Sequence, residues 1–123
     1  MKKIVLLIDD DLEEHDIFRL ALNEFNTDIQ FISATSGKYA LKLLKDASPD
    51  WIFLDINMPG MNGIDVLSEI KKLEWLKDVP VFMFSTSDGF MHSALALSLG
   101  AKKYLRKPNQ LNDLQIIFRD LLE

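Results

Sequence analysis

The chain has 123 residues, enough for one domain with a hydrophobic core and too few for two. Apolar residues make up 48% and charged residues 27%, which is ordinary for a soluble globular protein, and the net charge of -5 argues against the basic face of a nucleic-acid binder. Because the chain has no cysteine, disulfides, thiolate metal sites and cysteine nucleophiles are excluded.

Short apolar segments alternate along the chain with segments of helical periodicity. Strands are predicted at 3–8, 29–34, 50–55, 80–85 and 102–107. Helices are predicted at about 12–25, 36–47, 64–73, 89–99 and 111–122. This alternation is typical of a parallel sheet covered by helices on both faces, so the predicted class is α/β, a three-layer α/β/α sandwich.

The beginning of the chain resembles a signal peptide only superficially. Two lysines precede an apolar run that is too short, and Asp9 follows where a small-residue cleavage site should be. No stretch approaches the length of about eighteen apolar residues that a membrane helix needs. We therefore expect a cytoplasmic domain that occupies residues 1–123 and has no contact with a membrane.

Five polar residues end or directly follow the predicted strands. They are Asp9 and Asp10 directly after the first strand, Asp55 at the end of the third, Ser85 at the end of the fourth and Lys107 at the end of the fifth. Because parallel strands end at the same edge of a sheet, where ligands bind, we expect these side chains to converge on one pocket.

The three carboxylates predict a metal site. Crowded carboxylates repel one another unless they are protonated, hydrated or bridged by a cation, and Mg²⁺ is the natural cation for an all-oxygen site that keeps several waters. Lys107 would then hold a phosphoryl oxygen. The competing interpretation is that Asp9, Asp10 and Asp11 only cap the first helix, which is the role that we expect for Asp11.

A Ser-His-Asp hydrolase is a poor fit to the sequence. Ser85 could act as a nucleophile only with a histidine base, and the two histidines, His15 and His92, fall on predicted helices. Both are expected to be surface residues.

The same residues resemble those of a known family, the receiver domains of two-component response regulators, which includes the single-domain chemotaxis regulator. The resemblance covers essentially the whole chain and rests on four stretches that match in order and spacing. These are the strand before Asp9-Asp10-Asp11, the loop 55–63, the strand ending in Ser85, and the segment 104–108. It implies a flavodoxin-like fold with a five-stranded sheet in the order 2-1-3-4-5.

The resemblance also implies roles for residues. Asp55 would accept a phosphoryl group from a histidine kinase or a histidine phosphotransfer protein. Asp10, Asp55 and the backbone carbonyl of Asn57 would bind Mg²⁺, and Asp9 would orient one of its waters. Lys107 and Ser85 would hold phosphoryl oxygens. The domain would be no enzyme in the ordinary sense, although it would promote its own phosphorylation and dephosphorylation.

A conformational switch follows from the same resemblance. Ser85 would move toward the phosphoryl group and Tyr104 would turn inward, altering the face made by the fourth helix, fifth strand and fifth helix. The fourth helix is weakly polar, and two interpretations of it stay open: a partner-binding face, or core packing with scattered exposure. Its apolar residues are Phe90, Met91, Leu95, Leu97 and Leu99.

Two other functions remain as alternatives. One is a receiver that acts only as a binding module, and the other is a haloacid-dehalogenase-like phosphatase, which needs an Asp where Asn57 stands. A flavodoxin-like FMN carrier is disfavoured because the acidic loop after the first strand would repel the phosphate. We expect a monomer or weak homodimer that signals to an unidentified downstream protein and not to nucleic acid, either as a stand-alone receiver or as part of a longer protein.

Overall fold

The computed structural model describes residues 2–86, 90–108 and 110–123, with the side chains of Phe90 and Met91 left out. In chain order, its elements are β1 (Lys3–Ile8), α1 (Leu12–Phe25), β2 (Ile29–Ala34), α2 (Gly37–Leu44), β3 (Trp51–Leu54), α3 (Gly63–Lys71), the 3₁₀ helix η1 (Glu74–Leu76), β4 (Val81–Ser85), α4 (Phe90–Ser98), β5 (Lys103–Arg106) and α5 (Leu111–Leu122). Within these ranges, no helix is both long and apolar enough to cross a bilayer.

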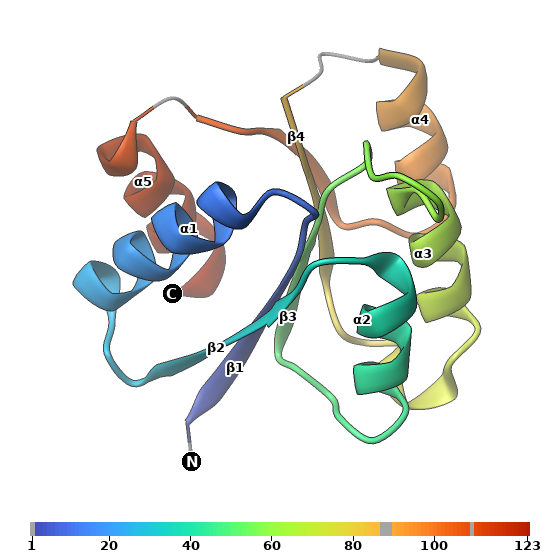
Figure 1. The fold of residues 1–123 in the computed structure, drawn as a ribbon, viewed down its shortest axis with the longest axis horizontal. Coiled ribbons are helices and arrows are strands. Elements are labelled where there is room, and N and C mark those ends of the chain that lie inside the picture. The colour runs from blue at the N-terminus through green and yellow to red at the C-terminus, as the bar shows by residue number, and fades with distance from the viewer. Residues whose placement is uncertain (1, 87–89, 109) are drawn as a thin grey trace.

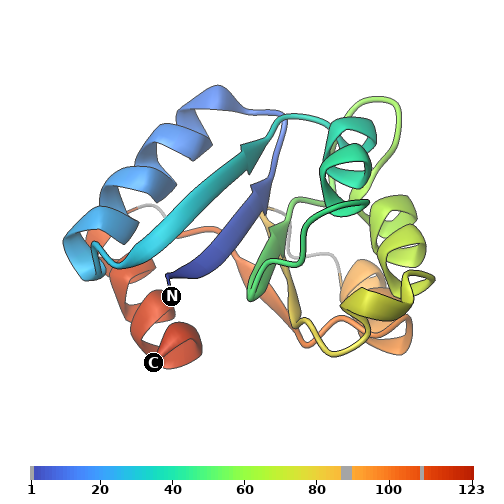
Figure 2. The same cartoon turned by 90° about the horizontal axis from the view of Figure 1, so that it is seen from below.

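The five strands form one parallel sheet in the order β2-β1-β3-β4-β5. Helices α1 and α5 cover one face of the sheet, and α2, α3 and α4 cover the other (Figure 1). Figure 2 shows the same three layers from below. The predicted fold class and strand order are therefore confirmed.

Burial of the strands follows their positions in the sheet. In β4 every residue is buried, and in β3 all are buried except Trp51, which is half-buried. A strand that helices cover on both faces needs such a continuous apolar run. The edge strands β2 and β5 are more polar, because each has one side that pairs with no other strand of the sheet.

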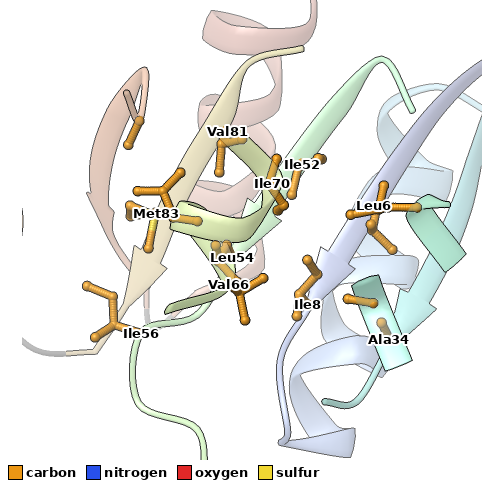
Figure 3. Close-up of a cluster of buried hydrophobic side chains, with 14 of the residues drawn as sticks. Leu6, Ile8, Ala34, Ile52, Leu54, Ile56, Val66, Ile70, Val81 and Met83 are labelled. Atoms are coloured by element: carbon orange, nitrogen blue, oxygen red, sulfur yellow. The ribbon is translucent and has the colours of Figure 1, made fainter. Parts of the chain in front are cut away.

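The two faces of the sheet have different cores. Figure 3 shows part of the cluster under α2, α3 and α4, which is aliphatic with two buried methionines, Met58 and Met83. The cluster under α1 and α5 is rich in rings, with Phe18 at its centre. The Phe18 ring centroid lies 4.9 Å from that of Phe118 and 5.1 Å from that of Phe53, both at steep interplanar angles. Edge-to-face packing of this kind adds to the free energy gained from burial.

Three helices begin at a side-chain cap. A carboxylate oxygen of Asp11 accepts from the backbone N–H of Glu13 (3.0 Å), and the Ser36 hydroxyl accepts from that of Tyr39 (3.1 Å). Asn62 caps α3 in the same way. Such caps satisfy backbone N–H groups that have no partner within the helix. The expected capping role of Asp11 is confirmed.

Most of the predicted boundaries agree with the structure, and the largest difference lies at the end of α2. This helix ends at Leu44 and not at residue 47, because Lys45 and Asp46 donate to carbonyls three residues back and tighten the last turn. The strands predicted at 50–55, 80–85 and 102–107 each lose one or two terminal residues. The 3₁₀ helix Glu74–Leu76 was not predicted.

Replacing Phe18 by alanine should lower the free energy of unfolding by about 3–5 kcal/mol, because it leaves a cavity among rings that cannot close around it. Chemical denaturation measures the loss. Ile17→Ala is the matched control on the same helix, since Ile17 is 46% exposed, and it should cost about 0.5 kcal/mol or less. Equal losses in the two variants would contradict this account of the core.

Candidate metal and phosphoryl site

The sheet brings the predicted site residues to one edge. Asp9 follows β1, Asp55 follows β3 and Lys107 follows β5, and each is tied to a neighbouring strand through its backbone. The Asp55 N–H donates to the carbonyl of Ile8 (2.9 Å), and the Lys107 N–H donates to that of Ser85 (2.8 Å). These bonds extend the strand pairing by one residue, so the side chains that follow the strands start from a fixed backbone.

Three carboxylates meet at this edge. Asp9, Asp10 and Asp55 each offer an oxygen, and these oxygens all lie within 4.8 Å of one another. Asp9 is completely buried and Asp55 is 5% exposed, whereas Asp10 is exposed. An all-oxygen set with one side open to water matches the preference of a hard divalent cation, and the residues therefore fit such an ion.

The Lys107 ammonium lies among these carboxylates. Its Nζ is 2.6 Å from Oδ2 of Asp9 and 3.7 Å from Oδ1 of Asp55. Burial alone would lower the pKa of Lys107, but the hydrogen bond to Asp9 and the charges of Asp9, Asp55 and Glu14 outweigh it, so the pKa is raised. Lys107 therefore remains a cation at neutral pH.

The setting of Asp55 disfavours its ionisation. Burial, and then the negative charge of Asp9, raise its pKa to about 6, against the opposing effects of Lys107 and a hydrogen bond from the backbone N–H of Asn57. Lys107 by itself does not neutralise the cluster. A bound cation would favour the ionised form of Asp55, which is the form that can act as a nucleophile.

All four polar atoms of Asp9 have partners. Its N–H donates to the carbonyl of Ala34 (3.0 Å), and its carbonyl accepts from Nε2 of His15 (2.7 Å). Oδ1 accepts from the backbone N–H of Asp11 (2.9 Å), and Oδ2 accepts from Lys107. Asp9 is thereby fixed in one orientation at the centre of the site.

The expectation that His15 is a surface residue is wrong. His15 is 3% exposed, and Nδ1 lies 2.7 Å from the Ser33 hydroxyl while Nε2 contacts Asp9. A signal was present in the sequence, because His15 precedes Phe18 and Leu22 by three and seven residues and so falls on their buried stripe. The expectation for His92 is confirmed, since it is exposed.

The remaining predicted site residues are Ser85, Tyr104 and Asn57. Ser85 is completely buried at the end of β4, and Tyr104 is half-buried against the aliphatic core. Asn57 is exposed, and with His92 it lines a shallow cavity of about 370 Å³ beside the loop that follows β3. The roles given to Ser85 and Tyr104 stay predictions.

Gly63 is a site residue whose importance the sequence did not reveal. Its N–H donates to the carbonyl of Ile56 (2.9 Å), and its Cα faces the backbone of Asp55. A Cβ here would lie 2.7 Å from Cα of Ile56 and would clash more severely with the carbonyl oxygen of Asp55. Only glycine therefore lets α3 begin this close to the candidate phosphoacceptor.

Comparison with known proteins gives a consistent assignment. The family model of the response regulator receiver domain matches residues 5–119. The transcriptional regulatory protein CpxR of Klebsiella pneumoniae is 37% identical over 117 residues, which are 94% of this chain and 46% of that protein. PhoP of Bacillus subtilis, a transcriptional regulatory protein of alkaline phosphatase synthesis, is 32% identical over 108 residues, 88% of this chain and 43% of that protein. The chain spans less than half the length of these relatives.

Solved structures of similar proteins agree. The Mn²⁺-bound response regulator Rcp1 has a TM-score of 0.87 and 29% identity, covering 98% of this chain and 95% of that one. The phosphorylated cyanobacterial phytochrome response regulator RcpA has a TM-score of 0.91 and 25% identity, covering 100% and 96%. The chemotaxis protein CheY4 of Vibrio cholerae, 23% identical with a TM-score of 0.87 and coverage of 98% and 99%, shares the fold.

Replacing Gly63 by alanine should weaken binding of Mg²⁺ by about tenfold, because the added methyl group displaces the backbone that carries Asp55. It should also destabilise the fold by about 1–3 kcal/mol. Calorimetric titration and chemical denaturation measure the two effects.

Gly60→Ala is the control for this substitution. Gly60 has a φ of 75°, but beyond its own atoms and those of its two chain neighbours, no atom of the described residues lies within 4 Å of the position a Cβ would take. The strain should cost about 1–2 kcal/mol of stability while Mg²⁺ affinity is retained. Equal affinity in wild type and Gly63→Ala would refute the role given to Gly63.

Binding of Mg²⁺ should weaken as the pH falls through about 6, because protonation of Asp55 then competes with the cation. In metal-free protein, the stability of the fold depends on pH in the opposite direction. Folding raises the pKa of Asp55 from 3.8 to about 6, so its protonated form favours the folded state, and this contribution to stability is lost as the pH rises through that window.

Two titrations test these opposite pH dependences of Mg²⁺ affinity and of stability. Mg²⁺ affinity is measured by calorimetry between about pH 5 and 8, and unfolding in EDTA is followed over the pH window in which Asp55 titrates. Asp55→Asn is the control, since it removes the titrating group. A wild-type stability curve parallel to that of Asp55→Asn would mean that the pKa of Asp55 is not raised.

Proposed function

The chain belongs to the family of response regulator receiver domains, and on that premise we propose that it is a Mg²⁺-dependent phosphoacceptor switch in which Asp55 receives the phosphoryl group. The observation that carries this proposal is the setting of Asp55. Its carboxylate is nearly buried, lies 3.7 Å from the Lys107 ammonium, and shares its space with the carboxylates of Asp9 and Asp10.

The proposed reaction is transfer from a phosphohistidine of a sensor kinase or a histidine phosphotransfer protein. A carboxylate oxygen of Asp55 attacks phosphorus, the P–N bond breaks with its electron pair staying on the imidazole nitrogen, and an acyl phosphate forms. Such a transfer needs positioning and neutralisation of charge more than covalent assistance. Lys107 supplies part of the neutralisation by contacting phosphoryl oxygens in addition to Asp9.

The acidic residues would hold the metal. Asp10, Asp55 and the backbone carbonyl of Asn57 would be the direct ligands, and Asp9 would orient a metal-bound water. Bound Mg²⁺ supplies positive charge next to the phosphoryl oxygens. The Mn²⁺-bound form of Rcp1 supports the proposed metal binding, and the phosphorylated form of RcpA supports the proposed phosphorylation.

Phosphorylation would act on the side of the molecule that contains α4 and β5. Ser85 would contact the phosphoryl group, and Tyr104 would turn further into the core, changing the face made by α4, β5 and α5. Leu95 and Leu97 on α4 are 46% and 47% exposed, which favours a contact surface for a downstream protein. The contribution expected of Phe90 and Met91 depends on their side chains, which lie outside the described part of the structure.

Incubation with acetyl phosphate and Mg²⁺ should add one phosphoryl group, detected by intact mass. The adduct should be absent in EDTA, because the carboxylates then repel the incoming group, and absent in Asp55→Asn, which lacks the nucleophile. Binding of beryllofluoride, a stable mimic of the phosphoryl group, is measured in parallel, because a short-lived adduct could escape detection by mass.

Two results would contradict the proposal. An adduct that persists in Asp55→Asn would place phosphorylation on another residue. Failure of both acetyl phosphate and beryllofluoride to modify the wild type would leave a domain that acts only by binding proteins.

A further inference from the structure

The peptide group between Asp9 and Asp10 is held by a side chain from α1. The carbonyl oxygen of Asp9 accepts a hydrogen bond from Nε2 of His15 at 2.7 Å. A carbonyl can only accept, so Nε2 carries the proton. Because this oxygen and the nitrogen of Asp10 belong to one rigid plane, the bond fixes the direction in which the chain continues into Asp10.

His15 is itself held from the opposite side of its ring. Nδ1 lies 2.7 Å from the hydroxyl of Ser33 on β2, and the ring packs against Phe31 with centroids 6.2 Å apart. At 3% exposure, the imidazole has little freedom to turn. Ser33 pairs in register with Leu7, two residues before Asp9, so the support comes from the edge strand next to β1.

Repulsion within the acidic cluster is the reason why Asp10 needs this support. Asp10 is exposed, and its carboxylate is repelled by those of Asp9 and Asp55 within 4.8 Å. A mobile loop would relieve the repulsion by turning Asp10 toward the solvent. Holding the Asp9–Asp10 peptide in place keeps Asp10 in the cluster before a cation arrives, and such preorganisation raises affinity.

We propose that His15, oriented by Ser33, is a positioning residue of the metal site, which sets the Asp9–Asp10 peptide and thereby the affinity for Mg²⁺. This inference rests on the proposed function, in which Asp10 and Asp55 bind the ion. It assigns a task to a histidine outside the four sequence stretches that identified the site, and to a serine on β2, the strand whose Ala34 carbonyl also accepts from the Asp9 N–H.

A pair of amide variants separates positioning from mere packing. In His15→Gln the side-chain nitrogen can take the place of Nε2, so the bond to Asp9 is kept while the acceptor for Ser33 is lost. In His15→Asn the shorter amide takes the place of Nδ1, so the contact with Ser33 is kept while the bond to Asp9 is lost. Both substitutions put an amide in place of the imidazole.

The proposal expects the two variants to differ. His15→Asn should weaken Mg²⁺ binding by about tenfold, whereas His15→Gln should stay within about threefold of wild type. Ser33→Ala should give an intermediate loss, because His15 then loses its orientation. Calorimetry measures affinity, and denaturation in EDTA checks that the two amide variants have similar stability.

A second measurement does not depend on metal. In metal-free protein, the backbone amide resonance of Asp10 should move in His15→Asn and stay near its wild-type position in His15→Gln. An unmoved resonance in folded His15→Asn would overturn the bracing of the peptide, and equal Mg²⁺ affinities in the two amide variants would overturn its link to the metal.

The outcomes also separate this inference from the proposed function. If wild type binds Mg²⁺ and is phosphorylated while His15→Asn matches it in both, the inference alone fails. If wild type binds no Mg²⁺, the proposed function fails and the inference fails with it.

Discussion

At the carboxyl edge of the sheet, the Lys107 ammonium lies 2.6 Å from a carboxylate oxygen of Asp9 and 3.7 Å from one of Asp55. Without this cation, two nearly buried carboxylates and the neighbouring Asp10 would repel one another in a medium that screens charge poorly. With it, the metal-free domain folds around an acidic cluster that is only partly neutralised. The raised pKa of Asp55 reflects the remaining repulsion, and binding of a cation would relieve it. The ion pair with Lys107 thus reduces the repulsion among the carboxylates without removing it.

Much of this arrangement was predictable from the sequence because its determinants are local. Continuous apolar runs such as 81–84 require a strand that is covered on both faces, and polar residues directly after such runs must emerge at one edge. Asp9, Asp55 and Lys107 follow this rule. The caps at Asp11 and Ser36 are local as well, since each depends on the next two or three residues.

The residues that the sequence left unexplained depend on contacts between distant segments. The stripe of α1 indicates that His15 is buried, but its partner Ser33 lies eighteen residues later on another element, and no periodicity reveals that partner. Gly63 looks like one more turn residue among Pro59, Gly60 and Asn62. Its role appears only when the backbone of Asp55 is found against its Cα. In both cases a local pattern constrains the residue type, whereas tertiary packing gives it a function.

We expect the unequal composition of the two cores to make one side of the domain more adaptable than the other. The rings that pack edge to face around Phe18 have few alternative arrangements, so we expect α1 and α5 to stay in place on the sheet. On the other side, the unbranched side chains of Met58 and Met83 have three rotatable bonds and adapt to changes of shape around them. We therefore expect a displacement that starts at the ends of β3 and β4 to be taken up more easily on the side of α3 and α4 than on the side of α1 and α5.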